Sequence, residues 1–353
     1  MAPQKPRPLL PDDLNEISMR LLPVAEHFRK ARILITGASG FIGGWLTESI
    51  LNLDERLGLE ISLVVNTRDP IDYAARLPHL SSDYRVLIWP GELGEGLPFE
   101  GLKGISHVVH AGSNVNRNMT SAEALDALQT LDQGTESLLR AGATWPLRRM
   151  LYVSSAAVYD LAPSHEVGFS DAVSAPPFLG TISAYATGKR VAELRTVLHA
   201  SIGGYGAVVA RLGAFLGPRL PLNSGFAAGN FIADALAGRC IKILGDGTPL
   251  RCYQYPVDMS VWLWTLLAIG QSGEAYNVGG GLPISLRELA EQINVIIGGP
   301  GIITQGTLDS SRHPDVYLPP VNKIQLEMGL SNCIKIEEAI RRTLQWYGLY
   351  SSI

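Results

Sequence analysis

Short apolar segments rich in β-branched residues alternate with longer amphipathic segments over most of the chain. The apolar segments read RILIT, ISLVVN, RVLIW, HVVHAG, MLYVSS and AVVARLG, and helical spacing is clearest between them at residues 121–141 and 183–200. Strand and helix repeated in this way predict parallel strands joined by helical crossovers on both faces of one sheet. The pattern therefore predicts an α/β fold with a doubly wound parallel sheet.

Three glycines follow the first apolar segment at three-residue spacing, in ILITGASGFIGGWL. Gly37, Gly40 and Gly43 stand where the strand ends and the next helix begins. Without side chains there, the backbone can turn tightly and lie close to a diphosphate, which the helix N-terminus then faces. The spacing differs from G-x-G-x-x-G, but the physical logic is the same. The segment indicates a dinucleotide site, and a plain turn before a helix is the alternative.

Changes in hydrophobic spacing and in Pro and Gly content divide the chain into three parts. Before Arg32, apolar residues recur at helical spacing with Pro23 interrupting, which predicts an amphipathic helix: Leu14, Ile17, Leu21, Val24 and Phe28. After Gly217 the chain changes to loops rich in Pro and Gly around shorter elements. We expect an N-terminal extension over 1–30, a dinucleotide-binding domain over 31–217, and mainly a substrate-binding lobe over 218–353, from which some segments return to the first domain.

Composition and charge exclude several classes of protein. The 353 residues are 46% hydrophobic, only 18% are charged, and the net charge is −4, so no strong field favours nucleic acid or anionic lipid. The three cysteines lack paired spacing, and the longest apolar stretch, 261–269, is far shorter than the ~20 residues of a spanning helix. The N-terminus has no apolar signal core. We expect a soluble cytoplasmic protein that binds neither nucleic acid nor membrane.

The seven histidines show no metal-ligand spacing, so we expect no metal site. His107 and His110 flank two valines on a predicted strand, where a hydrogen-bonded role in the core or beside a cofactor loop is favoured. Trp262 and Trp264 lie in an apolar segment and are predicted to pack in the core.

Seven motifs in order resemble those of the extended short-chain dehydrogenase/reductases, also called NAD-dependent epimerases and dehydratases. TGASGFIG is similar to their cofactor loop, HVVHAGS to the strand beneath the nicotinamide ribose, MLYVSSAAVY to the serine-bearing strand, and YATGK to the Tyr-x-x-x-Lys pair. RLGAFLGPR, GDGTPLRCYQYPVD and EAYNVGGGLPISLRELAEQI continue the match into the substrate region. The resemblance covers nearly the whole chain from Arg32. It implies a Rossmann-type sheet with a smaller C-terminal substrate-binding lobe.

Tyr185 and Lys189 are four residues apart in a helical segment, so both side chains project from one face. A free phenol has a pKa of about 10, and a nearby ammonium, aided by a positive nicotinamide ring, is expected to lower it. Ser155 ends a predicted strand and matches the catalytic Ser/Thr of the family. The resemblance implies that these three residues are catalytic, with Ser155 bound to the reacting sugar oxygen.

Further site residues are implied by the same resemblance. It assigns cofactor binding to the following residues, together with Tyr185 and Lys189: Gly37, Ser39, Gly40, Phe41, Ile42, Gly43, Thr67, Arg68, Glu92, Leu93, Ala111 and Gly112. It assigns substrate binding to Ser113, Ser155, Asn230 and Arg251. One departure weakens the inferred nucleotide-sugar substrate, because Ala214 stands where many members have an Asn that contacts it.

The end of the second predicted strand bears on the choice of cofactor. An acid there takes the ribose hydroxyls of NAD, whereas a nearby Arg accommodates the extra phosphate of NADP. The chain reads Val65-Asn66-Thr67-Arg68-Asp69-Pro70 and has no acid at the strand end, which favours NADP bound by Arg68. NAD, with Asn66 or Asp69 on the ribose, is the alternative. The preceding LNLDERLGLE is interpreted as an insertion that obscures the register.

The residues after Ser155 limit the reaction. Family dehydratases carry an Asp–Glu pair there, and this chain has Ala156 and Ala157; a Cys, as in reductases that also epimerise, is absent. We predict an NADP(H)-dependent nucleotide-sugar oxidoreductase that reduces a 4-keto sugar at C4. The alternatives are an NAD-dependent 4-epimerase, a reductase of a non-sugar carbonyl, and a non-catalytic NADP-binding regulator. Family members commonly dimerise through the Tyr-x-x-x-Lys helix, where an apolar stripe of this chain serves either a homodimer or the core: Val191, Leu194 and Leu198.

Overall fold

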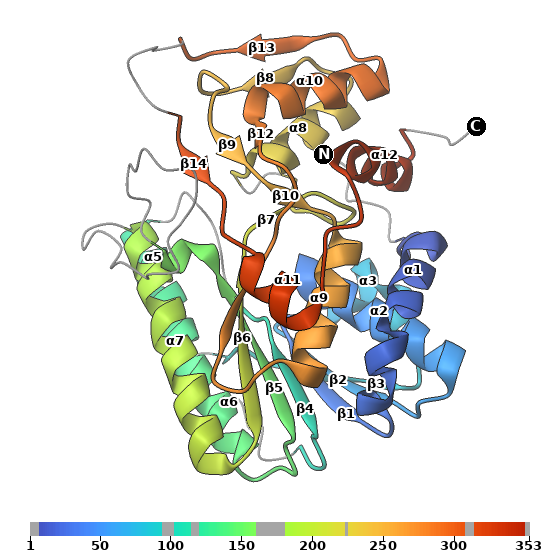
Figure 1. Ribbon diagram of the computed structural model, residues 1–353, viewed down its shortest axis with the longest axis vertical. Helices are drawn as coiled ribbons and strands as arrows, with labels where there is room; N and C mark the ends of the chain where they lie inside the picture. Colours follow the sequence, from blue (N-terminus) through green and yellow to red (C-terminus); the bar gives the residue numbers. More distant parts are fainter. Residues whose placement is uncertain are drawn as a thin grey trace.

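A seven-stranded parallel sheet forms the centre of the computed structural model, which describes residues 7–93, 102–113, 120–159, 181–222, 225–307 and 314–349 (Figure 1). In spatial order its strands are β11 (Ala275–Val278), β6 (Gly206–Leu212), β5 (Arg149–Ser155), β4 (His107–His110), β1 (Arg32–Thr36), β2 (Ser62–Thr67) and β3 (Val86–Pro90). The order reverses between β1 and β4, the point where open α/β sheets bind ligands. The predicted doubly wound α/β fold is confirmed.

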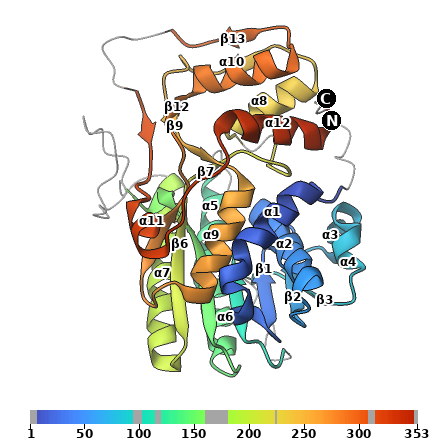
Figure 2. The same cartoon turned by 45° about the vertical axis from the view of Figure 1, so that its right-hand side comes forward.

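Helices cover both faces of this sheet, which is why its strands are nearly continuous apolar runs (Figures 1 and 2). One face carries α5 (Ser121–Gln129), a π-helical turn (Thr130–Gly134), α6 (Thr135–Gly142) and α7 (Thr181–Gly203). The other carries α1 (Pro11–Leu21), α2 (Phe41–Leu57) and α9 (Pro256–Ile269). The short helices α3 (Pro70–Arg76) and α4 (Pro78–Ser81) join β2 to β3. The tryptophans predicted to lie in the core, Trp262 and Trp264, are fully buried on α9.

The segment interpreted as an insertion is helix, so that interpretation was wrong. LNLDERL forms the last turns of α2, and Gly58 ends the helix in the left-handed conformation with φ 59°. The register of β2 is then fixed, with Asn66 paired to Thr36 on β1 and to Trp89 on β3. Thr67 and Arg68 consequently follow at the carboxyl edge of the sheet.

A smaller lobe lies above the carboxyl edge of the sheet (Figure 1). It contains paired short strands: β7 (Ala214–Phe215) with β10 (Tyr253–Gln254), β8 (Ile241–Ile243) with β13 (Ile302–Thr304), and β9 (Leu250–Arg251) between β12 (Ile284–Ser285) and β14 (Val316–Tyr317). Its helices are α8 (Ala227–Leu236), α10 (Leu286–Ile297) and α12 (Ile336–Tyr347). The chain returns to the main sheet with α9, β11 and the neighbouring α11 (Asn322–Met328).

The N-terminal segment is part of the core. The predicted apolar stripe is buried, and the helix changes at Leu22 to a 3₁₀ helix over Leu22–Phe28 that contains Pro23. Helix α1 packs against α2 and α9 (Figure 2). Buried Asp13 also accepts a hydrogen bond of 2.8 Å from Arg342 of α12. This segment therefore ties the first domain to the last helix of the chain.

Replacement of Phe28 tests this role. The Phe28 ring is fully buried and meets Trp264 edge-on, with ring centroids 5.4 Å apart. We expect Phe28→Ala to lower the free energy of unfolding by about 3–5 kcal/mol, because it leaves a cavity in the core. Urea denaturation measures the loss, with Leu22→Ala, whose side chain is 45% exposed, as the control. Equal small losses in both variants would show that the segment does not belong to the core.

Candidate active site

The glycine turn after β1 has no room for side chains. Gly37 has φ +67°, and a Cβ added to it would lie 2.8 Å from Gly112 Cα. A Cβ on Gly43 would lie 2.4 Å from the Gly37 carbonyl oxygen. Gly40 caps α2 without a side-chain hydrogen bond, so the N–H groups of the first helical turn keep no acceptor of their own. Bare backbone and a helix N-terminus therefore face the same space, which suits an anionic group.

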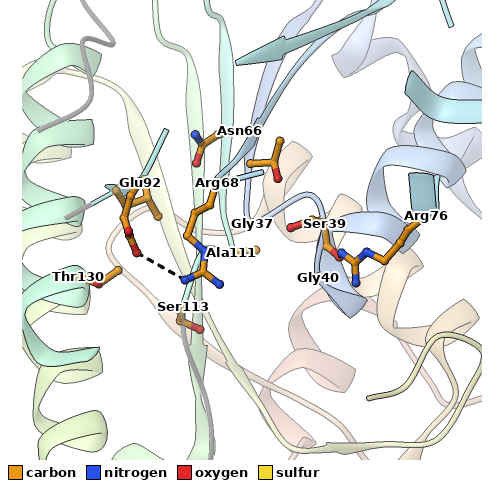
Figure 3. A pocket seen from close by; sticks show the side chains of 13 residues that line it. Gly37, Ser39, Gly40, Asn66, Arg68, Arg76, Glu92, Ala111, Ser113 and Thr130 are labelled. Atoms are coloured by element: carbon orange, nitrogen blue, oxygen red, sulfur yellow. Dashed lines mark hydrogen bonds and ion pairs between the residues drawn. The ribbon is translucent and has the colours of Figure 1, made fainter. Parts of the chain in front are cut away.

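A cavity of about 280 Å³ opens beside this turn, at the carboxyl ends of β1, β2 and β4 (Figure 3). Predicted cofactor residues that line it are Gly37, Ser39, Gly40, Thr67, Arg68, Glu92, Leu93, Ala111 and Gly112; Ser113, predicted to bind substrate, lines it too. Phe41, Ile42 and Gly43, which form the first turn of α2, are not among the residues that line it. The cavity is also lined by Arg76 and Thr130, which were not predicted, and by Asn66, which was predicted to contact the ribose only in the NAD alternative. The residues present suit a dinucleotide, because glycines without side chains let the backbone of the turn close tightly beside the cavity and leave the first turn of α2 open to a diphosphate.

The polar side chains at the end of β2 and just after it differ in how firmly other groups of the protein hold them. The Asp69 carboxylate caps α3 and accepts hydrogen bonds of 2.9 Å from the N–H groups of Ile71 and Asp72. The Asn66 amide donates to the carbonyl oxygens of β3 and the following turn. Arg68 is 61% exposed and lies 3.5 Å from Glu92 across the cavity (Figure 3). Arg68 could therefore bind a further anion at this edge if it left its ion pair with Glu92.

A second guanidinium group borders the same cavity. Arg76 donates a hydrogen bond of 2.6 Å to the Ser39 carbonyl oxygen in the glycine turn (Figure 3). The Asp69-Pro70 pair could have revealed its position, because it marks a helix start that brings Arg76 back to the turn. Thr130 belongs to the π-helical turn, which no motif in the sequence indicates.

Tyr185 lies at the start of α7 and is almost completely buried. Its hydroxyl is hydrogen-bonded to Ser155 at the end of β5 and to Ser113 at the cavity. Burial raises the pKa of Tyr185 to about 12, although both hydrogen bonds act to lower it. Burial therefore outweighs both hydrogen bonds, and the expected lowering of this pKa by the ammonium together with a positive nicotinamide ring stays a prediction for the complex with the oxidised cofactor. The phenol is therefore protonated at neutral pH.

Lys189 is buried one turn further along α7. Its ammonium donates a hydrogen bond of 2.7 Å to the Val153 carbonyl oxygen and lies 5.8 Å from the centre of the Tyr185 ring. Burial lowers the pKa of Lys189 to about 7, and the carboxylate of Glu193 opposes this shift. The structure thus brings Ser155, Tyr185 and Lys189 together beside the cavity that Ser113 lines.

His110 is buried at the end of β4, directly before the residues Ala111 and Gly112 that line the cavity. Its Nδ1 lies 2.7 Å from the Thr36 hydroxyl and its Nε2 lies 3.0 Å from the Thr135 hydroxyl. Burial lowers the pKa of His110 to about 3, so the ring is neutral. The expected hydrogen-bonded role is confirmed. Within the described ranges, no group of three or more His, Cys, Asp or Glu side chains could hold a metal ion.

The two predicted substrate residues of the smaller lobe lie apart from the cavity lining. Arg251 on β9 pairs with Asp315 at 2.7 Å, so this ion pair would have to open or rearrange for Arg251 to bind a diphosphate. Asn230 is half-buried on α8.

The apolar stripe of α7 lies on the surface. Leu194 is 61% exposed and Leu198 is 52% exposed, so the alternative that the stripe packs in the core is wrong.

Among the helices of the described residues, none is long and apolar enough to cross a membrane.

Comparison with known proteins agrees with the fold. The model of the NAD dependent epimerase/dehydratase family matches residues 33–279. A dTDP-glucose 4,6-dehydratase of Actinoplanes sp. is 28% identical, over 90% of this chain and 97% of its own. UDP-glucuronic acid decarboxylase 1 of Xenopus tropicalis is 27% identical, over 92% of this chain and 73% of its own. The solved UDP-glucuronic acid 4-epimerase of Bacillus cereus, in complex with UDP-glucuronic acid and NAD, has a TM-score of 0.74 at 19% identity, covering 90% of this chain and 99% of its own.

Proposed function

The chain belongs to the NAD-dependent epimerase/dehydratase family, and on that premise we propose that it is an NADP(H)-dependent oxidoreductase that reduces a 4-keto nucleotide sugar at C4. The observation that carries this proposal is the buried, protonated Tyr185 between two serine hydroxyls, one of which lines the cavity beside the glycine turn. The bound cofactor would supply hydride to the carbonyl carbon. A proton must reach the carbonyl oxygen at the same time, and a phenol with a raised pKa is suited to donate it.

The residues of this chain have separate roles in the proposed reaction. Tyr185 donates its proton to the carbonyl oxygen, which becomes the new hydroxyl. Ser155 and Ser113 hold that oxygen against the phenol through hydrogen bonds. The Lys189 ammonium lies beside the phenol and stabilises the phenolate left after proton transfer. The glycine turn holds the cofactor diphosphate on the first turn of α2.

Water elimination is not part of the proposed reaction. Two relatives are named for elimination and decarboxylation, but the positions after Ser155 hold Ala156 and Ala157, in a short 3₁₀ helix. Their methyl groups can neither accept nor return a proton. Hydride and proton transfer at a single carbon is the chemistry that the remaining groups support.

Arg68 tests the proposed cofactor. NAD is bound in the similar solved epimerase, whereas the exposed Arg68 at the cavity edge favours the 2′-phosphate of NADP. We expect Arg68→Gln to weaken NADPH binding about 10- to 100-fold and NADH binding less than about 3-fold, since only NADPH carries that phosphate. Isothermal titration calorimetry measures both affinities, with Arg140→Gln on the exposed face of α6 as the control. Equal weakening of both cofactors would assign Arg68 to the shared part of the dinucleotide.

Two measurements test the proposed activity. Mass spectrometry of small molecules released from the purified protein identifies retained cofactor and nucleotide sugar. The protein is then mixed with NADPH and a dTDP- or UDP-linked 4-keto-6-deoxy sugar, and we expect oxidation of NADPH with formation of the 4-hydroxy sugar. Stoichiometric retained NAD(H), with interconversion of C4 epimers and no NADPH consumption, would favour a 4-epimerase. Turnover of carbonyl compounds that lack a nucleotide diphosphate would favour a non-sugar reductase.

A further inference from the structure

A buried carboxylate lies one turn beyond Lys189, outside the groups assigned to the reaction. Glu193 accepts a hydrogen bond from the Ser154 hydroxyl and pairs with Arg211, whose Nη2 lies 2.7 Å from Oε2. Two further contacts of the Arg211 Nε, at 3.0 and 3.3 Å, make the pair nearly bidentate. The charges are therefore held in one geometry rather than in a loose surface contact.

The partners of this carboxylate flank the proposed reaction centre. Ser154 lies on β5 between Val153, whose carbonyl oxygen accepts from the Lys189 ammonium, and Ser155, which is bonded to Tyr185. A hydrogen bond from Ser154 to α7 consequently fixes both of these neighbours relative to the helix.

The network continues toward the smaller lobe. Arg211 on β6 donates to the Tyr159 hydroxyl at 3.2 Å, which donates to Asn277 on β11 at 2.7 Å. Asn277 donates in turn to the carbonyl oxygen of Pro320, just before α11. The carboxylate is thus the junction of a polar chain that joins α7, three adjacent strands and the segment that enters α11.

We propose that Glu193 is a positioning residue that locks the carboxyl end of β5 onto α7 and keeps the buried ammonium charged and in register with the phenol. This inference rests on the proposed function. The carboxylate acts through its neighbours and need not touch substrate or cofactor. Its charge matters as well as its hydrogen bonds, because it and Arg211 exert opposite fields on the ammonium.

Other charged or titratable groups also face the Lys189 ammonium. On its own helix these are Tyr185 and the carboxylate, and on β5 the Tyr152 ring lies 5.0 Å away. Neutral His110 faces it from β4. A Tyr185→Phe background removes the titration of the phenol, so that the remaining pH dependence near neutrality reports mainly on the ammonium.

The test measures the ratio of NADP⁺ to NADPH affinity from pH 5.5 to 9.5 in the full-length Tyr185→Phe protein. Only the oxidised nicotinamide ring is positive, so a charged Lys189 opposes NADP⁺ selectively, and the ratio should rise as the ammonium loses its proton. Titration of the 2′-phosphate is common to both forms and cancels in the ratio. The midpoint of this rise therefore reports the pKa of Lys189 without any need for substrate.

The two single variants should shift the midpoint in opposite directions. Glu193→Gln leaves the Arg211 charge uncompensated, and we expect the midpoint to fall by about one pH unit. Arg211→Gln leaves the carboxylate uncompensated, and we expect a rise of about one unit. Glu136→Gln breaks an ion pair on the outer side of α7 and should leave the midpoint unchanged.

A double variant controls for loss of stability in the single variants. An unpaired buried charge destabilises a fold more than removal of both charges of the pair does. Glu193→Gln combined with Arg211→Gln should return the midpoint to within about 0.3 unit of the parent. Single variants that both melt at lower temperature but share the parent midpoint would show a merely structural carboxylate and overturn the proposal. Failure of the parent protein to bind either cofactor form would instead overturn the proposed function, and the positioning role with it.

Discussion

Replacement of Tyr185 by Phe is expected to lower kcat for reduction of the 4-keto sugar by about 10³- to 10⁴-fold, because the proposed reaction loses its proton donor. The phenol is held by two serine hydroxyls and is protonated at neutral pH. Phe retains the ring and its packing in the core, so cofactor affinity and the unfolding temperature should stay close to those of the parent. Steady-state kinetics with NADPH, together with calorimetric titration of the cofactor, separate the chemical loss from loss of binding.

Tyr205→Phe is the matched control for this experiment. Tyr205 is also buried, and its hydroxyl has no hydrogen-bond partner within the described residues. Its loss should therefore leave kcat within about 2-fold of the parent. Turnover by Tyr185→Phe within about 10-fold of the parent would assign proton donation to another group and would remove the main support for the proposed mechanism.

The raised pKa of Tyr185 also bears on the direction of the reaction. A phenol that keeps its proton is prepared to act as an acid, as reduction of a carbonyl requires. An epimerase must first remove a proton from a hydroxyl, and it would need a bound positive nicotinamide to lower this pKa. In the proposed reduction the phenol therefore acts as an acid, whereas a 4-epimerase would use it first as a base and then as an acid.

The strands follow from local sequence, and so does the glycine turn. Burial on both faces makes RILIT and HVVH continuous apolar segments, and this pattern is visible without coordinates. The turn after β1 must have glycines, because backbone approaches there leave no space for a Cβ. Resemblance to a known family then supplied Tyr185, Lys189 and Ser155, which the structure brings together.

Features that depend on packing between distant segments were not predictable in the same way. The pKa of Tyr185 is set mainly by burial, which no motif reports, so the sequence alone did not indicate that this pKa is raised. Arg251 was assigned from its motif, but its partner Asp315 is far away in sequence. Thr130 reaches the cavity in a π-helical turn within a segment whose pattern indicated an ordinary helix.

Gly43→Ala is expected to weaken cofactor binding about 100-fold, or about 2.8 kcal/mol. The expected loss comes from a steric clash, and it runs against the gain in helix stability that Ala would otherwise bring. Gly43 lies inside α2, where Ala alone would stabilise a helix by about 1 kcal/mol. The added methyl group, however, would lie 2.4 Å from the Gly37 carbonyl oxygen and 2.6 Å from Ala38 Cα. Both are backbone atoms, so the turn itself must move, and the anion-binding groups move with it.

A Gly→Ala change at a second position serves as the control for the effect of the substitution itself. Gly245 lies in the smaller lobe with no atom within 4 Å of an added Cβ, so Gly245→Ala should leave cofactor affinity unchanged. Calorimetric titration with NADPH measures affinity, and thermal unfolding measures stability, for both variants. If Gly43→Ala were more stable than the parent and bound NADPH equally well, helix propensity would outweigh the close approach. The glycine turn would then not be the cradle of the cofactor diphosphate, because moving its backbone would have had no effect on binding.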